Sequence, residues 1–354
     1  MAFPIRSVSK TVFFLLCSAV CCTQALFGQS SLNTQIDSLL RLTAPRPFNG
    51  VVMIVRNGKT IYAKSHGFAD SARTTSLRLS NQFILGSISK QTTAVLVLQQ
   101  LEKGNLSLQD PIRKYLPDLK AAWADSVTVH HLLSHTSGVV REEEPLAFRP
   151  GTGFLYSGIL GYQLLARVAE KASGKTYPEL AAGLFNGCKM RNTTIPARYR
   201  KGSLAGSFTE APGGTLQPQK FTMKDVEPPT PAGGVISTTK DLAQWNECLH
   251  GGKLLQESTY KLMTTAYAAR PHARWGNVGY GYGLQVDHGG GIVEYSHSGT
   301  LAGFIGTNLY YPASGTSIVV LENVAWDFSD QIRMFYFHDQ IRQLFRNRLL
   351  SGQP

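Results

Sequence analysis

Ser87 and Lys90 are the first pair in this sequence whose types and spacing could carry out chemistry. They lie in the stretch from Ile84 to Lys103, which reads ILGSISKQTTAVLVLQQLEK. A serine hydroxyl beside an amine that can accept its proton is the minimum apparatus for nucleophilic catalysis. Residues three apart share one face of a helix, so the Lys90 amine can reach the Ser87 hydroxyl if this stretch is helical.

The element that must position this pair is an expected helix beginning at Ser87. The stretch contains no proline, and no glycine follows Ser87 until Gly104. Apolar side chains recur at roughly helical spacing, at Ile88, Val95, Leu98 and Leu101. At a helix N-terminus, free backbone N–H groups and the helix dipole favour developing negative charge. We therefore expect Ser87 to stand where an oxyanion is stabilised.

Spacing alone does not select this pair, because the S-x-x-K pattern occurs four times. The matches are Ser7–Lys10, Ser87–Lys90, Ser237–Lys240 and Ser258–Lys261. The ordinary explanation of any one match is a helix cap followed by a solvated lysine. What separates Ser87 is the apolar helix behind it and a set of partner motifs further along the chain.

Those partner motifs follow in a fixed order. They are VHHLLSHTSGV at 129–139, YSG at 156–158, PAGGVISTTKDL at 231–242 and HSGTLAGF at 297–304. With GSISK at 86–90, they make the chain resemble the serine β-lactamase and penicillin-binding-protein superfamily. Within it, the resemblance is to the class C-like branch of β-lactamase-related serine hydrolases, carboxypeptidases and esterases. It extends from about Phe48 to the C-terminus, and five ordered motifs are far more specific than any one of them.

The resemblance implies a role for each side chain near the nucleophile. Ser87 would be acylated, and Lys90 would lower its pKa or accept its proton. Tyr156 would be a second base, with its phenolate favoured by Lys90 and returned to phenol as the leaving group is protonated. A tyrosine before a helix is more often a packing residue, so this role depends on its place in the motif series.

The HSG motif would supply the remaining groups of the site. The backbone N–H groups of Ser87 and Thr300 would form the oxyanion hole. His297 and Ser298 would line the substrate-facing side of the strand, and Gly299 completes the motif, although it could equally be a bulge or turn glycine. The resemblance implies no metal and no organic cofactor.

One departure from the family pattern concerns the substrate. Gly158 stands at the third position of the Tyr-x-Asn motif, so the side-chain amide that would hold a substrate carbonyl is missing. Loss of one polar contact costs about 1–3 kcal/mol of transition-state binding. We expect this loss to affect β-lactam and peptide-amide hydrolysis more than ester hydrolysis.

Two other active-site chemistries fit the sequence poorly. His131 and His135 have the H-x-x-x-H spacing of a zinc site, but no Glu follows His131 and no third ligand is evident. The α/β-hydrolase fold requires a G-x-S-x-G elbow, and no serine here has glycine on both sides at that spacing.

The order of expected elements predicts an α+β protein. A helix over 31–42 and a hairpin over 50–67, turning at Asn57-Gly58, come before the Ser87 helix. Further helices are expected at 128–138, 159–173 and 241–249, loops at 195–232, strands at 281–287, 292–297, 303–311 and 316–323, and a final helix at 329–350. Strands near both termini predict one antiparallel sheet flanked by helices. We expect a sheet domain at 26–85 plus 231–354, a mostly helical domain at 86–230, and the active site between them.

The N-terminus predicts export. Residues 1–25 combine the basic residues Arg6 and Lys10 with an apolar run and end in Thr-Gln-Ala, so we expect a signal peptide cleaved after Ala25. Cys21 and Cys22 raise lipidation as an alternative, but the residues before them form a poor lipobox. The expected location is periplasmic or secreted, with no transmembrane span in the mature chain.

Charge and cysteine content narrow the possible partners. The net charge is +12, but the basic residues are dispersed, which argues against nucleic acid and is compatible with an anionic envelope or an acidic substrate. Cys188 and Cys248 remain after signal removal and fit either a disulfide or two buried thiols. Neither belongs to a C-x-x-C motif, which argues against a thiol active site.

These observations predict an exported serine hydrolase that forms an acyl-enzyme at Ser87. Its substrate would be a small ester, an amide or a peptidoglycan-derived molecule. One alternative is a true class C-type β-lactamase or D-Ala-D-Ala carboxypeptidase. A second is a non-catalytic envelope-binding protein that retains the fold.

Overall fold

The structure is a computed structural model that describes residues 31–200 and 202–352. The predicted signal peptide, including Cys21 and Cys22, lies outside the described residues. The strands are β1 Gly50–Arg56, β2 Lys59–His66, β3 Phe83–Ile84, β4 Phe208–Glu210, β5 Leu216–Pro218, β6 Ile236–Ser237, β7 Ala268–His272, β8 Gly276–Tyr280, β9 Gln285–Asp287, β10 Glu294–Leu301, β11 Phe304–Tyr311, β12 Thr316–Glu322 and β13 Val324–Ala325. The α-helices are α2 Leu32–Leu40, α3 Lys90–Glu102, α4 Val129–Leu133, α5 Leu160–Ser173, α6 Tyr177–Gly187, α7 Met223–Val226, α8 Thr239–His250, α9 Glu257–Met263, α10 Gln331–Met334 and α11 Tyr336–Leu350.

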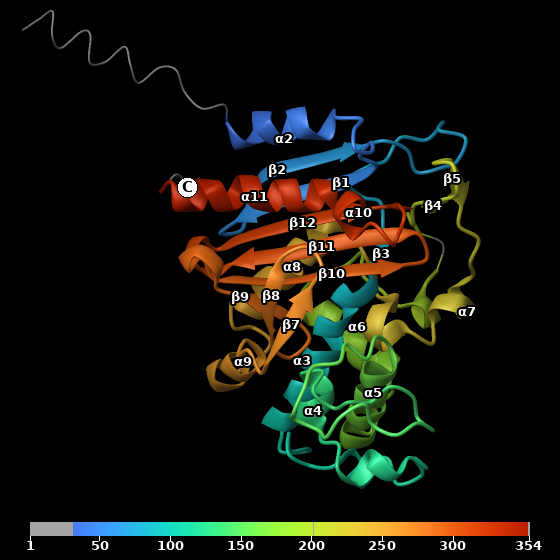
Figure 1. Ribbon diagram of the computed structural model, residues 1–354, viewed down its shortest axis with the longest axis vertical. Coiled ribbons are helices and arrows are strands. Elements are labelled where there is room, and N and C mark those ends of the chain that lie inside the picture. Colours follow the sequence, from blue (N-terminus) through green and yellow to red (C-terminus); the bar gives the residue numbers. More distant parts are fainter. Residues whose placement is uncertain (1–30, 201, 353–354) are drawn as a thin grey trace, which may run out of the picture.

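One antiparallel sheet dominates the fold and confirms the predicted α+β class. Its eight strands run in the order β2-β1-β12-β11-β10-β9-β8-β7, so segments near both ends of the chain meet in its centre. Helices α2 and α11 cover one face, and α8 packs on the other (Figure 1). Because both faces are covered, the residues of β1 from Gly50 to Val55 are all buried.

The first hairpin forms where the sequence predicts it. Asn57 and Gly58 connect β1 to β2 with φ angles of 47° and 77°. Two consecutive positive φ values are typical of the type I′ turn, whose twist matches that of the flanking strands. Asn and Gly are the residues that adopt this backbone at least cost, which is why so short a signal is sufficient.

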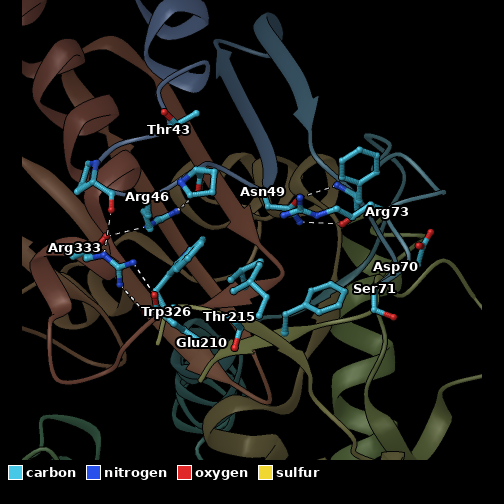
Figure 2. A pocket seen from close by; sticks show the side chains of 17 residues that line it. Thr43, Arg46, Asn49, Asp70, Ser71, Arg73, Glu210, Thr215, Trp326 and Arg333 are labelled. Carbon is cyan, nitrogen blue, oxygen red and sulfur yellow. Dashed lines mark hydrogen bonds and ion pairs between the residues drawn. The ribbon is translucent and has the colours of Figure 1, made fainter. Parts of the chain in front are cut away.

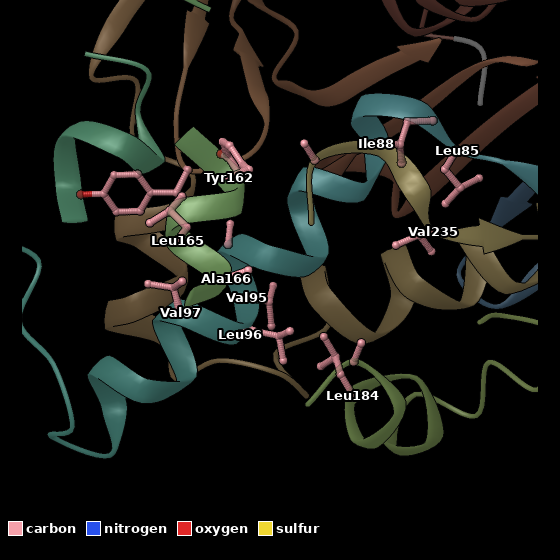
Figure 3. Close-up of a cluster of buried hydrophobic side chains, with 14 of the residues drawn as sticks. Leu85, Ile88, Val95, Leu96, Val97, Tyr162, Leu165, Ala166, Leu184 and Val235 are labelled. Atoms are coloured by element: carbon pink, nitrogen blue, oxygen red, sulfur yellow. The ribbon is translucent and has the colours of Figure 1, made fainter. Parts of the chain in front are cut away.

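Helix α3 lies in the lower half of the molecule in Figure 1 and is buried on almost all sides. Figure 3 shows Val95, Leu96 and Val97 of this helix among side chains of α5, α6 and the strand region around Val235. The buried polar side chain of Gln91 is satisfied by the indole N–H of Trp245 at 2.9 Å. The helix is therefore a fixed central support for the residues that precede it.

The predicted helix start at Ser87 is wrong by three residues. Gly86–Ser89 form a turn of 3₁₀ helix, and α3 begins at Lys90. Gly86 has a φ of +53°, which an α-helix does not accommodate. Ser87 and Lys90 still share one face, because side chains at i and i+3 are aligned in a 3₁₀ turn.

Several elements differ from expectation because their signals are not local. Residues 208–218, predicted as loop, form β4 and β5, and β4 pairs with β13. Strands β7 and β8 were not predicted, and the final helix is divided at Phe335 into α10 and α11. We predicted a sheet domain at 26–85 plus 231–354 and a helical domain at 86–230, and this division stays a prediction. The β4–β5 segment does not fit it, because these strands lie within 86–230 and β4 pairs with β13.

Cys188 and Cys248 form a disulfide that joins the C-terminal end of α6 to α8. Their Cα atoms are 5.8 Å apart and 60 residues separate them in the sequence. The bond therefore joins the helical region to a helix on the sheet, which resolves the alternative that the sequence left open.

Candidate active site

The structure brings Ser87 and Lys90 into direct contact. The Lys90 Nζ atom lies 3.0 Å from the Ser87 Oγ and 3.1 Å from the backbone carbonyl oxygen of Ala232. Ala232 belongs to the PAGG motif, which forms a π-helical turn over Thr230–Gly234. The motif at 231–242 thus supplies a carbonyl acceptor that holds the Lys90 amine beside the Ser87 hydroxyl.

Lys90 is suited to accept a proton near neutral pH. Its side chain is buried, and this burial, with a smaller effect from the Arg270 charge, lowers the pKa of Lys90 to about 7. Desolvation acts in this direction because it penalises the charged ammonium form. A large fraction of Lys90 is therefore a neutral amine at pH 7, as a general base requires.

Tyr156 lies over the same amine. The Lys90 Nζ is 5.0 Å from the centre of the Tyr156 ring, and the neighbouring Ser87 side chain acts to lower the pKa of Tyr156. Burial raises the pKa of Tyr156, and this effect exceeds the lowering by Arg270 and by Ser87. This direction favours the phenol form, and the role of Tyr156 as a second base stays a prediction.

Two glycines let the nucleophile turn and β10 approach backbone to backbone. A Cβ on Gly86 would overlap the backbone nitrogen of Thr300, and one on Gly299 would lie 2.7 Å from the backbone nitrogen of Ser87. The two nitrogens predicted to form an oxyanion hole therefore lie beside this contact. Ser87 and Thr300 remain partly exposed, so solutes can reach them. Gly299 is therefore needed because the two backbones come so close together, and it is not simply a turn glycine.

His297 and Ser298 do not both face the nucleophile, because consecutive side chains in a strand point to opposite faces. His297 is on the face of Gly299, with its ring 6.2 Å from that of Tyr156. Ser298 is on the other face, where its hydroxyl accepts from Arg274 at 2.8 Å and contacts Thr307 at 3.2 Å. The expectation that the Ser298 side chain lines the substrate side is therefore wrong.

His297 supports Tyr156 from inside the protein. It is fully buried, its Nδ1 donates to the Ser298 carbonyl at 2.6 Å, and its Nε2 accepts from the Tyr280 hydroxyl at 3.0 Å. Burial, reinforced by the charges of Arg270 and Lys90, holds the pKa of His297 well below its usual value. Its side chain is therefore a neutral ring packed behind the site, with no free nitrogen to offer a substrate.

His135 has the same supporting position in the HTSG turn. It has a φ of +59°, and its buried ring lies 4.5 Å from the Tyr156 ring and 4.9 Å from that of Tyr280. The Nδ1 of His131 accepts from the backbone of Thr128 as part of a helix cap. Among the described residues, no group of three or more His, Cys, Asp or Glu side chains could hold a metal ion.

Gly158 has room for a larger side chain. It has a φ of +55°, and no atom lies within 4 Å of where its Cβ would be. Crowding therefore does not explain why this position lacks a side-chain amide.

Arg270 lies at the site, although no motif of the sequence points to it. It stands on β7, which was not predicted as a strand, and its guanidinium carbon lies 4.5 Å from the centre of the Tyr156 ring. Sheet pairing places β7 at the far edge from β1, next to β8. Only this tertiary arrangement brings residue 270 to residue 156.

The comparisons with known proteins agree with this geometry. A family model described as Beta-lactamase matches residues 43–340. The chain belongs to the Beta-lactamase family. The predicted resemblance to the β-lactamase and penicillin-binding-protein superfamily is thereby confirmed, and with it the expectation of a serine hydrolase.

Several known proteins are similar to part or most of this chain. Penicillin-binding protein 4* of Bacillus subtilis is 25% identical over 347 residues, which cover 87% of this chain and 73% of that protein. Esterase EstB of Burkholderia gladioli is 29% identical over 185 residues, or 41% of this chain and 47% of the esterase. The solved octameric penicillin-binding protein homologue from Pyrococcus abyssi is 25% identical with a TM-score of 0.75, over 90% of this chain and 77% of that one.

The described part of this Beta-lactamase family chain contains no helix of the length and apolar character needed to cross a membrane.

Proposed function

We propose that this protein is an exported serine hydrolase that acts through an acyl-enzyme at Ser87. The observation that carries the proposal is the 3.0 Å contact between the Ser87 Oγ and the Nζ of a lysine whose pKa is lowered to about 7. A serine at its ordinary pKa is a poor nucleophile and needs an adjacent base. Lys90 is that base, and its neutral form is populated at physiological pH.

Acylation follows from this arrangement. Neutral Lys90 accepts the Ser87 proton as the Oγ attacks the substrate carbonyl, and the oxyanion receives hydrogen bonds from the N–H groups of Ser87 and Thr300. As the carbonyl re-forms, the bond to the leaving group breaks. Tyr156 donates its proton to that group and recovers one from the Lys90 ammonium. The products are an ester on Ser87, the protonated leaving group, and neutral Lys90.

Deacylation uses the same groups with water as the nucleophile. Neutral Lys90, directly or through Tyr156, accepts a proton from a water molecule that attacks the acyl carbonyl. The second oxyanion collapses, the bond to the Ser87 Oγ breaks, and the Oγ takes the proton back. The released product is the free acid, and no cofactor is consumed.

The substrate class is a small ester, an amide or a peptidoglycan-derived molecule. Relatives named as a penicillin-binding protein and as an esterase support this range. Within this range, Gly158 favours esters over amides. An ester carbonyl is more reactive than an amide carbonyl, so ester hydrolysis tolerates the loss of one polar contact better. Export is supported by the basic and apolar character of residues 1–25.

Hydrolysis of p-nitrophenyl acetate and of nitrocefin tests this proposal. We expect turnover of the ester by the wild type, loss of that turnover in Ser87→Ala, and a much lower rate with nitrocefin. Faster hydrolysis of nitrocefin than of the ester would favour a true β-lactamase. Absence of both activities in the wild type would favour the non-catalytic binding protein.

A further inference from the structure

Arg270 is a cationic side chain beside the proposed catalytic tyrosine, and it has no carboxylate partner among residues 31–200 and 202–352. Its guanidinium carbon lies 4.5 Å from the centre of the Tyr156 ring and 5.9 Å from that of Tyr280. Its Nη1 atom is buried and has no hydrogen-bond partner in the part of the chain that the structure describes. A buried donor without an acceptor costs about 1–3 kcal/mol, so such an atom indicates a missing partner.

Several other arginines close to the sheet are paired with an acid, and Arg56 on β1 donates to the Thr316 hydroxyl instead. The cavity in Figure 2, with a volume of about 620 Å³, is lined by two of them, Arg46 and Arg333. Arg46 donates to both carboxylate oxygens of Glu322 at 2.8 and 2.6 Å, and Arg333 donates to both oxygens of Glu210 at 2.6 and 2.7 Å. Arg270 forms no ion pair among the described residues, so it differs from these structural arginines.

No carboxylate of the described residues is prominent in the electrostatics around Arg270. The strongest electrostatic influences on the pKa values of Lys90, Tyr156 and His297 include the Arg270 charge and include no Asp or Glu. In the part of the chain that the structure describes, the site therefore combines the Arg270 guanidinium with the titrating Lys90 amine and no counter-charge among these main influences. Such a site attracts anions, and a planar guanidinium matches a carboxylate through two parallel hydrogen bonds.

We propose that Arg270 is a specificity-determining residue that binds a carboxylate of the substrate beside Ser87 and Tyr156. The proposal rests on the function proposed above and narrows the substrate class to esters or amides that carry an acidic group. The carboxylate would give Nη1 the acceptor it lacks. It would also compensate the charge that Arg270 places next to Lys90.

Two pairs of esters test the proposal, one for each side of the scissile bond. On the acyl side, mono-p-nitrophenyl succinate is compared with p-nitrophenyl butyrate, whose terminal methyl replaces the carboxylate. On the leaving-group side, 3-acetoxybenzoate is compared with phenyl acetate. The readout is the ratio of kcat/KM for the anionic ester to that for the neutral ester. We expect this ratio to fall at least tenfold in Arg270→Gln for one of the pairs, and to fall less in Arg270→Lys.

The ratio of kcat/KM for the anionic and neutral esters separates a loss of carboxylate binding from a change in the basicity of Lys90. Removing Arg270 also changes the pKa of Lys90, but that change affects both esters of a pair equally. Arg78→Gln is the matched control, because Arg78 is exposed and carries the same charge. An Arg270→Gln ratio equal to that of the wild type in both pairs would overturn the proposal. Circular dichroism and fluorophosphonate labelling of Ser87 show whether each variant is folded.

A calorimetric titration tests Arg270 even if no ester is hydrolysed. We expect wild-type protein to bind benzoate at least tenfold more tightly than benzamide, and Arg270→Gln to lose this preference. Equal affinities in the wild type would overturn the carboxylate site. Failure of hydrolysis with an intact benzoate preference would instead contradict the proposed enzyme activity alone.

Discussion

The amine of Lys90 lies between the hydroxyl of Ser87, at 3.0 Å, and the backbone carbonyl of Ala232, at 3.1 Å. A neutral amine has two N–H bonds and one lone pair. Donation to the Ala232 carbonyl leaves the lone pair free to accept the Ser87 proton. This relationship joins the first and fourth motifs of the sequence in a single function. It also explains why a turn more than 140 residues after the nucleophile belongs to the site.

The first prediction concerns pH. Because burial lowers the pKa of Lys90 to about 7, kcat/KM for a neutral ester should rise through this pH and then level off. The sign follows from the base being active only when deprotonated, so activity is lost as the pH falls below the pKa. The measurement is a pH–rate profile between pH 5 and 10. A rate that keeps rising to pH 10 would show a lysine with its ordinary pKa and contradict this role.

Tyr156→Phe should separate proton donation from packing. Burial raises the pKa of Tyr156, so the residue acts as a phenol, and removing its hydroxyl should lower kcat about 10²–10⁴-fold. The melting temperature should change little, since the ring and its contact with His135 are kept. Tyr260→Phe is a control outside the site. Near-normal turnover in Tyr156→Phe would show that a group other than Tyr156 donates the proton to the leaving group.

Gly158→Asn should shift the enzyme toward amides. Its backbone has a φ of +55°, a region that Asn tolerates better than most residues, and a Cβ added there meets no atom within 4 Å. A restored carbonyl contact of about 1–3 kcal/mol should raise the amide-to-ester ratio of kcat/KM about tenfold. Gly158→Ala supplies the same backbone strain without the amide. An equal ratio in both variants would show that an amide at 158 does not reach the substrate.

The disulfide predicts a loss of stability on reduction. Opening a loop of about 60 residues removes roughly 4 kcal/mol of stabilisation in the chain-entropy account. Urea unfolding should therefore shift to lower concentrations in dithiothreitol, while Cys188→Ala/Cys248→Ala should unfold at a similar concentration with and without it. If reductant leaves the wild-type midpoint unchanged, the bond between Cys188 and Cys248 contributes little to stability.

The parts of the fold that could be predicted have local causes. The hairpin at Asn57-Gly58 follows from two residues that tolerate positive φ, and the 160–173 helix ends at Gly174 for the same reason. Ser87, Lys90 and Tyr156 could be chosen because their motifs are ordered along the chain. Their roles remain proposals.

What could not be predicted depends on contacts between distant segments. Arg270 reaches Tyr156 only because β7 joins the edge of a sheet whose order is not encoded locally. The side-chain direction of Ser298 follows from the register of β10, which a three-letter motif does not state. The protonated state of Tyr156 follows from burial, which becomes visible only in three dimensions.

The most direct test of the account is intact-mass analysis after treatment with a fluorophosphonate, which bonds to an activated serine with loss of fluoride. Ser258 is the matched control, because it is exposed and also precedes a lysine by three residues. The account predicts one adduct on the wild type and on Ser258→Ala, and none on Ser87→Ala. An adduct that persists in Ser87→Ala, or none on the wild type, would contradict the assignment of Ser87 as the nucleophile.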